Sequence, residues 1–242
     1  MQAHEIAAAN FTRHLQQNTY PGRGFVLGRS SIDASWLMVY WIMGRSSQSR
    51  NRRFVVEGSS LRTEPLDASR LDNPSLIVYH AMLELPPIYL IGNGDQVHTI
   101  YAALQAGTSF DAALATRERE PDAPHYTPRI SAMLDMQPRP ASLTLSLLKA
   151  NVANPAYTDR TTYRPAAPPA GLGIGLTTYL GDGNPLPSFR ADPLLLPCVG
   201  PAREVLETYW EALDSNNRVA VAVKRIPGDG TKSEIVLRNR FE

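Results

Sequence analysis

The longest uninterrupted apolar run in the chain, residues 36–43 (WLMVYWIM), limits what this sequence can fold into. The run is rich in aromatic and branched residues, which favour strands, and it lacks the polar face of a half-exposed strand. A run of strand length also lies at 85–91. Both runs are far shorter than the roughly 20 residues that a membrane-spanning helix needs. The sequence therefore predicts a core built on buried strands, with no membrane partner.

The remaining periodic segments predict more strands than helices. Further strands are expected at 24–28, 53–57, 75–80, 129–135, 141–148, 172–179, 218–226 and 233–240. Helices are expected at 4–17, 97–106, 110–119 and 201–213, and loops at 121–128, 151–170 and 183–196. Because the helices do not alternate regularly with the strands, a doubly wound parallel sheet is disfavoured. We expect one α+β domain in which helices cover a mostly antiparallel sheet.

The charge of the chain comes almost entirely from arginine. The 242 residues carry a net charge of +1, which gives no case for binding nucleic acid. There are 21 arginines and only 3 lysines. This bias has two interpretations, which are codon composition and the gripping of phosphate or carboxylate groups by planar guanidinium forks. Local clustering has to decide between them.

The sequence offers few ligands for a metal or a cofactor. Cys198 is the single cysteine, and the five histidines show no close metal-binding spacing, so no metal and no cofactor are expected. The glycine-rich segment 171–175 follows the proline-rich 165–170 rather than a strand, so it is expected to be a strand or bend and not a dinucleotide loop. Residues 1–10 carry Glu5 and lack a basic stretch followed by an apolar one, so a cytoplasmic protein is expected.

An arginine- and serine-rich segment at 45–53 (RSSQSRNRR) follows the longest apolar run. It holds four arginines and three serines, and guanidinium and hydroxyl groups together suit a phosphate dianion. The alternative is a solvated hairpin turn. Both interpretations stay open on the pattern alone.

Three other segments place polar side chains beside predicted strands. In 91–96 (IGNGDQ), glycines and a helix start allow close approach of a polar or anionic ligand, although a simple turn capped by Asp95 fits equally. In 125–130 (HYTPRI), a hydroxyl and a guanidinium stand at the start of a strand. Tyr79, near the end of a predicted strand, is either a core residue or a site residue.

These segments, in this order, resemble the archaeal-type IMP cyclohydrolase family. The resemblance covers roughly residues 20–225 and rests on five motifs in register. The matching residues are Tyr20-Pro21-Gly22-Arg23, Arg45-Ser46 with Asn51-Arg52, Asn73-Pro74 with Tyr79, Asn93-Gly94 with Gln96 and Gly107, and Thr127-Pro128-Arg129-Ile130.

The resemblance implies a four-layer αββα sandwich like that of the N-terminal-nucleophile hydrolases, here without a usable N-terminal nucleophile. It also implies closure of 5-formamidoimidazole-4-carboxamide ribotide to IMP, a purine nucleotide, with release of water. The implied domain spans 20–242, after a helical extension at 1–19. We assign the phosphate to Arg45, Ser46, Arg50 and Arg52, and substrate binding also to Asn51. The base and carboxamide are assigned to Asn93, Gln96 and Thr127. The expected catalytic residues are Tyr79 for proton transfer, Arg129 for an orienting or polarising role, and Asn93.

The chain also departs from the family pattern. His80 and Tyr126 stand where the family has asparagines, and His98 stands where it has an aspartate. These departures keep two alternatives open, a related cyclodehydratase acting on a different amide or formamide and a noncatalytic nucleotide-binding protein. The sequence also leaves open whether the chain forms a homo-oligomer.

Overall fold

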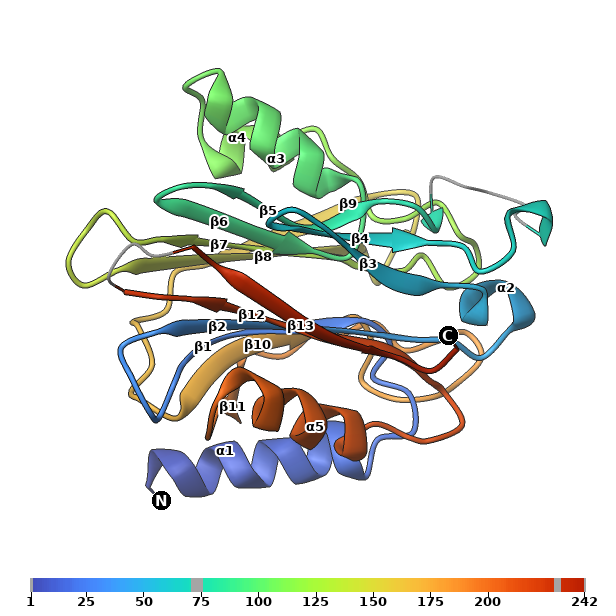
Figure 1. Cartoon of the computed structure of the whole chain (residues 1–242). Helices are drawn as coiled ribbons and strands as arrows, with labels where there is room; N and C mark the ends of the chain where they lie inside the picture. The colour runs from blue at the N-terminus through green and yellow to red at the C-terminus, as the bar shows by residue number, and fades with distance from the viewer. Residues whose placement is uncertain (1, 71–75, 229–231, 242) are drawn as a thin grey trace.

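Two antiparallel β-sheets face each other in the computed structural model, which describes residues 2–70, 76–228 and 232–241 (Figure 1). Two helices cover the outer face of the seven-stranded sheet, and two others cover the outer face of the six-stranded sheet (Figure 1). The apolar faces of the two sheets form the main core between them. The expected α+β class, with antiparallel sheets under helices, is confirmed.

The six-stranded sheet is built around the apolar run that limited the fold. Every residue of that run, now strand β2 (Trp36–Met43), is buried, because sheet neighbours flank it and layers cover both its faces. The strand order across this sheet is β11 (Leu194–Pro197), β10 (Leu172–Thr177), β1 (Gly24–Arg29), β2, β12 (Arg218–Ile226) and β13 (Glu234–Asn239). The glycine-rich segment 171–175 thus lies largely in strand β10 and forms no nucleotide loop.

The seven-stranded sheet follows chain order from edge to edge. Its strands are β3 (Arg53–Glu57), β4 (Ser60–Glu64), β5 (His80–Leu85), β6 (Ile88–Gly92), β7 (Arg129–Asp135), β8 (Ser142–Ala150) and β9 (Thr158–Tyr163). Such an order needs only hairpins and local excursions between neighbouring strands. The longest excursion, between β6 and β7, contains two helices and the segment that leads into the candidate site.

The helices pack their apolar sides on the outer faces of the sheets. Helix α5 (Ala202–Ala212) buries Val205, Leu206, Tyr209 and Trp210 against the six-stranded sheet. Helix α3 (Gln96–Gln105) buries Val97 and Ile100, which join a second apolar cluster with α4 (Phe110–Leu114). Two short helical turns, α2 (Ser47–Arg50) and η2 (Ala68–Arg70), lie in connections.

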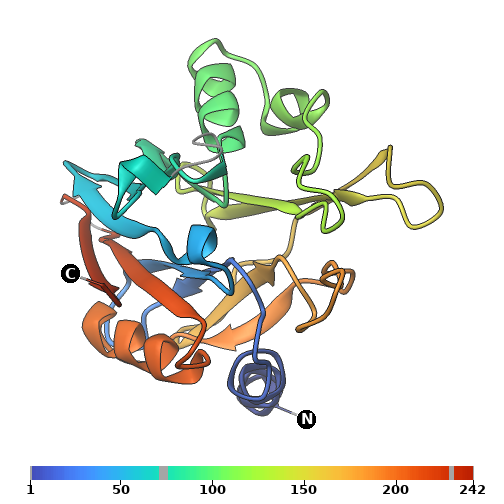
Figure 2. The same cartoon turned by 90° about the vertical axis from the view of Figure 1, so that its right-hand side faces the viewer.

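The segment expected as an N-terminal extension forms α1 (Ala3–Phe11) and η1 (Thr12–Gln16). Figure 2 shows this helix end-on, on the outer side of the six-stranded sheet. The side-chain amide of Asn10 donates to the carbonyl of Leu195 in β11 at 3.1 Å. The segment is therefore part of the outer helical layer.

The predicted boundaries of the two strands after residue 74 are wrong. Strand β5 runs from His80 to Leu85, where a strand had been expected to end at residue 80. The turn falls at Pro86-Pro87, because neither proline can donate a ladder hydrogen bond, and β6 begins at Ile88. The Asn73-Pro74 motif lies outside the described residues, as do Ser75 and residues 229–231.

Three other expectations are corrected. The segment 151–170 is not wholly irregular because it contains β9, an edge strand whose polar sequence TDRTTY shows no apolar alternation. The segment 183–196 contains most of β11. The second predicted helix ends at Leu114 rather than 119, and beyond it Arg117 forms an ion pair with Asp95 at 2.6 Å.

The described part of the chain contains no helix that combines the length and the apolar character of a membrane span.

Candidate active site

A cavity of about 370 Å³ opens at one end of the two sheets. The antiparallel register places the start of β1 beside the ends of β2 and β10, since Gly24 pairs with both Trp41 and Thr177. The segments that flank these strand ends therefore meet, together with the segment that leads into β7. The lining residues are Tyr20, Gly22, Arg23, Met43, Arg45, Ser46, Gln48, Ser49, Arg52, Leu76, Ile77, Glu120, Asp122, His125, Thr127, Tyr179 and Leu186.

One wall of the cavity is the arginine- and serine-rich segment. Ser46 caps the short helix α2, accepting from the backbone N–H of Ser49 at 3.1 Å, while its own backbone N–H donates to the Ser49 hydroxyl at 2.9 Å. Gly44 allows this helix to approach closely, because a Cβ there would lie 2.6 Å from the backbone of Ser49. Both serines line the cavity.

Two arginines from this segment complete that wall. Arg52 is 5% exposed, and its guanidinium donates to the carbonyl of Ser49 at 2.9 Å and to that of Met43 at 3.2 Å. Arg45 is more open, forms an ion pair with Asp182 and lies 5.0 Å above the ring of Tyr20. The backbone thus holds the buried Arg52, while the partner of Arg45 is an exposed carboxylate that an anion can replace.

Arg50 and Asn51, two other predicted substrate-binding residues, stand outside the cavity lining formed by the described residues. The guanidinium of Arg50 donates to the carbonyl of Gly44 at 2.9 Å. The side chain of Asn51 makes two hydrogen bonds of 2.8 Å with the backbone of Asp67. Both side chains hold the loop in shape.

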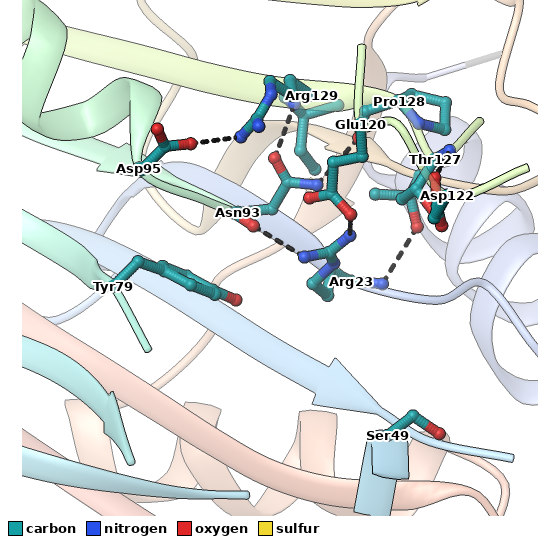
Figure 3. Close-up of polar contacts among 12 residues, drawn as sticks. Arg23, Ser49, Tyr79, Asn93, Asp95, Glu120, Asp122, Thr127, Pro128 and Arg129 are labelled. Atoms are coloured by element: carbon teal, nitrogen blue, oxygen red, sulfur yellow. Dashed lines mark hydrogen bonds and ion pairs between the residues drawn. The ribbon is translucent and has the colours of Figure 1, made fainter. Parts of the chain in front are cut away.

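A buried ion pair forms the opposite wall (Figure 3). Arg23 donates to Glu120 at 2.8 Å and to the backbone carbonyl of Asn93 at 2.7 Å, and both charged side chains are less than 10% exposed. Burial raises the pKa of Glu120 above its usual value, although the charge of Arg23 opposes this. Burial also acts to lower the pKa of Arg23, but Glu120 together with Tyr79 and Tyr40 outweighs it, and the net shift is upward. A buried carboxylate that lines a cavity and has a raised pKa is a candidate group for proton transfer.

Asn93, Gln96 and Arg129 converge next to this ion pair, but their side chains contact one another. The amide of Asn93 donates to the carbonyl of Pro128 at 2.8 Å and its oxygen accepts from the backbone N–H of Ile130 at 2.9 Å. Gln96 donates to the oxygen of Asn93 at 2.9 Å and accepts from Arg129 at 2.9 Å. These bonds tie the start of α3 to the start of β7.

Gly94 leaves room for these side-chain contacts. A Cβ at that position would lie 2.6 Å from a guanidinium nitrogen of Arg129 and 2.7 Å from the side-chain oxygen of Gln96. Arg129 also forms an ion pair with Asp95 at 2.7 Å, and burial lowers the pKa of the arginine. Hydrogen bonds and an ion pair therefore join the segment 91–96 to the start of β7, next to the cavity.

Thr127, a predicted binding residue, lies in the cavity wall. Its backbone N–H donates to Asp122 at 2.7 Å, and its hydroxyl contacts both Asp122 and the hydroxyl of Tyr179. Burial raises the pKa of Tyr179. The ring of Tyr179 stacks on that of Tyr20, with centroids 6.0 Å apart, so an aromatic surface lies beside the hydrogen-bonding group.

Tyr79 is buried, with 4% of its surface exposed, and it belongs to the core between the sheets. Its hydroxyl lies 2.8 Å from that of Tyr40, whose pKa is raised well above its usual value by burial and by Tyr79. Figure 3 shows the hydroxyl end of Tyr79 turned toward Arg23. The cavity lining found among the described residues does not include Tyr79.

Several lining residues were not among the predicted site residues. Arg23 belonged to a matched motif, Tyr20–Arg23, but had been given no role. Glu120, Asp122 and His125 lie in a loop with no periodic pattern, so no signal marked them. The backbone N–H of Leu186 donates to Nδ1 of His125 at 3.1 Å, which leaves Nε2 as the protonated nitrogen of the neutral ring.

The described residues contain no group of three or more histidine, cysteine or acidic side chains that could hold a metal ion. Burial raises the pKa of the Cys198 thiol to about 12, so this cysteine is neutral and inert at physiological pH.

Two comparisons with known proteins were informative. A search of curated proteins finds no match, whereas a family model does match. A model of the family described as IMP cyclohydrolase-like protein matches residues 20–230, which include every segment that lines the cavity. The chain belongs to the IMP cyclohydrolase-like protein family.

Proposed function

We propose that this chain closes 5-formamidoimidazole-4-carboxamide ribotide to IMP. The observation that carries the proposal is that an arginine and serine wall faces a buried Arg23–Glu120 pair across the same cavity, in a chain of this family. The first wall suits a 5′-phosphate, and the second offers groups for proton transfer. We further propose an N-terminal-nucleophile-hydrolase-like domain over 20–242, in a cytoplasmic enzyme of purine nucleotide biosynthesis.

The reaction is an intramolecular cyclodehydration. The carboxamide nitrogen attacks the formyl carbon and forms a C–N bond, one proton leaves the nitrogen, and the former formyl oxygen becomes a hydroxyl. Loss of the proton on the former formamide nitrogen, and departure of the hydroxyl as water once it is protonated, then give the ring and one water. Because nucleophile and electrophile share one molecule, holding the reactive rotamer is a large part of catalysis.

Arg45, Ser46, Ser49 and Arg52 are the proposed phosphate ligands. Arg52 is held in place by two backbone carbonyls, so little ordering is needed when the anion binds. Phosphate would replace the exposed carboxylate of Asp182 at Arg45. The heterocyclic base of the nucleotide then lies toward Tyr20, Tyr179 and Thr127, where aromatic and hydroxyl groups meet.

Proton transfer is assigned to Glu120 and Tyr79. Glu120 lines the cavity and carries a raised pKa, which suits a base that must take a proton from an amide nitrogen near neutral pH. Tyr79 points toward Arg23 and is the candidate donor to the leaving hydroxyl (Figure 3). Because Tyr79 is not among the described residues that line the cavity, its proton reaches the substrate either after the Arg23 side chain moves aside or through a water molecule.

Asn93, Gln96 and Arg129 are proposed to position these groups. The backbone carbonyl of Asn93 holds Arg23, and its side chain holds the start of β7. Gln96 and Arg129 fix that arrangement by their mutual hydrogen bond. Each side chain therefore acts on the reaction through the Arg23–Glu120 pair.

The three residues that depart from the family pattern are not among the described residues that line the cavity. His80 and His98 contact each other at 2.8 Å, and Tyr126 lies beneath the guanidinium of Arg119 at 4.6 Å. These positions give no support for a changed substrate. Conversion of the formamido nucleotide to IMP by the purified chain tests the proposal, whereas binding without conversion would favour a noncatalytic protein.

Substitution Arg52→Ala is expected to weaken IMP binding by ~1.5–3 kcal/mol, the scale of a hydrogen bond to a charged group. Calorimetric titration of IMP into both proteins measures this loss. The matched control is Arg53→Ala, because Arg53 points to solvent and pairs with Glu64 at 3.3 Å. Equal affinities of the wild-type protein and the Arg52→Ala variant would remove Arg52 from the phosphate site.

Dialysis against a strong chelator is expected to leave cyclisation unchanged, because protein side chains alone are proposed to move the protons. The initial rate before and after dialysis checks this expectation. A loss of rate that one divalent ion restores would contradict the proposed chemistry.

A further inference from the structure

A pair of histidines stands on the outer face of the seven-stranded sheet, away from the cavity. Nε2 of His98 lies 2.8 Å from Nδ1 of His80, and the two rings meet nearly at right angles. His98 is in the first turn of α3, and His80 begins β5. Eighteen residues separate them in sequence, so no spacing pattern could reveal the pair.

A carboxylate approaches the outer nitrogen of the pair. Glu57 on β3 lies 3.4 Å from Nε2 of His80, and its other oxygen lies 3.3 Å from Arg62. A carboxylate on the far nitrogen of an imidazole is the arrangement that orients histidine ligands at metal sites and raises their basicity. Nδ1 of His80 is thereby directed toward His98.

We propose that His80 and His98 bind one divalent transition-metal ion between Nδ1 of the first and Nε2 of the second, with Glu57 orienting His80. Imidazole pairs favour zinc, nickel or copper over magnesium or calcium. The described residues offer no third protein ligand, so water completes the coordination. The site is separate from the proposed reaction and does not depend on it.

The geometry allows a metal ion to replace the proton of the hydrogen bond between the two imidazole nitrogens. At Zn–N distances of 2.0–2.1 Å and a tetrahedral angle, two ligand nitrogens stand about 3.3 Å apart. The present 2.8 Å must therefore open by about half an ångström. His98 is exposed and the His80 side chain is 25% exposed, so both rings can turn and the ion can enter from solvent.

A metal at this position would join α3 to the sheet. The same first turn of α3 carries Gln96, which holds Asn93 and Arg129 behind the cavity. Metal binding is therefore expected to raise the melting temperature by linking two elements that the apolar cluster around Val97 already packs together.

Titration of zinc chloride into untagged, chelator-treated protein tests the site. We expect one zinc ion to bind per chain. The affinity for zinc should be at least ~10-fold lower in His80→Gln and in His98→Gln, and ~10-fold lower in Glu57→Gln. The control His4→Gln, on the exposed part of α1, should bind as the wild-type protein does. Zinc should also raise the melting temperature of the wild-type protein but not of His98→Gln.

Two results would overturn the site. One is a zinc affinity that is unchanged in His98→Gln. The other is a wild-type protein that binds no more zinc than the double variant His80→Gln, His98→Gln. Neither result bears on the cyclisation, which is measured separately in metal-free buffer.

Discussion

Substitution Tyr79→Phe is expected to lower kcat by ~10²–10⁴ with little change in the affinity for IMP. The phenol O–H can donate a proton to a leaving hydroxyl, and phenylalanine cannot. The ring and its packing between the sheets are kept, so the fold is retained. Steady-state rates with the formamido nucleotide, together with thermal melting, measure both effects.

A matched control separates chemistry from the loss of a buried hydroxyl. Tyr209 is also fully buried, and its hydroxyl donates to the carbonyl of Pro197 at 3.0 Å, far from the cavity. Tyr209→Phe should lower the melting temperature and leave kcat unchanged. If Tyr79→Phe behaves in the same way, Tyr79 is a core residue and takes no part in proton transfer.

Substitution Glu120→Gln is expected to reduce kcat/KM by ~10²–10⁴ and to change its pH dependence. The base must be ionised, so wild-type activity falls as the pH drops through the pKa of Glu120. Because burial raises that pKa, the acid limb should lie above the value near 4.3 of an ordinary glutamate. The glutamine variant should lose this limb, and a retained limb would assign it to another group.

The same change also leaves Arg23 buried without its ionic partner, which costs stability. Glu84→Gln supplies the comparison, because Glu84 pairs with the buried Lys224 at a different part of the sheets. Both variants should melt at lower temperatures, but only Glu120→Gln should lose activity. Equal losses of activity would point to a general effect of broken ion pairs.

Much of the fold could be predicted because burial leaves a pattern in the sequence. Strand β2 was clear from its uninterrupted apolar run, and α5 from its periodic apolar side. Strand β9 was missed because an edge strand with a polar sequence carries no such pattern. The boundary at Pro86-Pro87 was misplaced because the flanking residues are apolar on both sides of the turn.

The candidate site was only partly predictable. Part of the arginine- and serine-rich segment 45–53 lines the cavity, but the pattern could not show that Arg50 and Asn51 stand outside that lining. Asn93 and Arg129 were recognised as motif residues, but only the three-dimensional structure shows their contacts. Asn93 binds the backbone on either side of Arg129, and Arg129 binds the side chains of Asp95 and Gln96. Glu120 reaches the cavity through the fold of a loop, which no local pattern encodes.

Turnover of the formamido nucleotide tests the central claim most directly. Purified wild-type protein, Glu120→Gln and the control Arg53→Ala are each incubated with the nucleotide in metal-free buffer, and IMP is measured by chromatography. We expect the wild-type protein and Arg53→Ala to form IMP at equal rates and Glu120→Gln to form it at least ~10²-fold more slowly. Failure of the wild-type protein to form IMP faster than the buffer alone, while it still binds IMP, would contradict the proposed reaction.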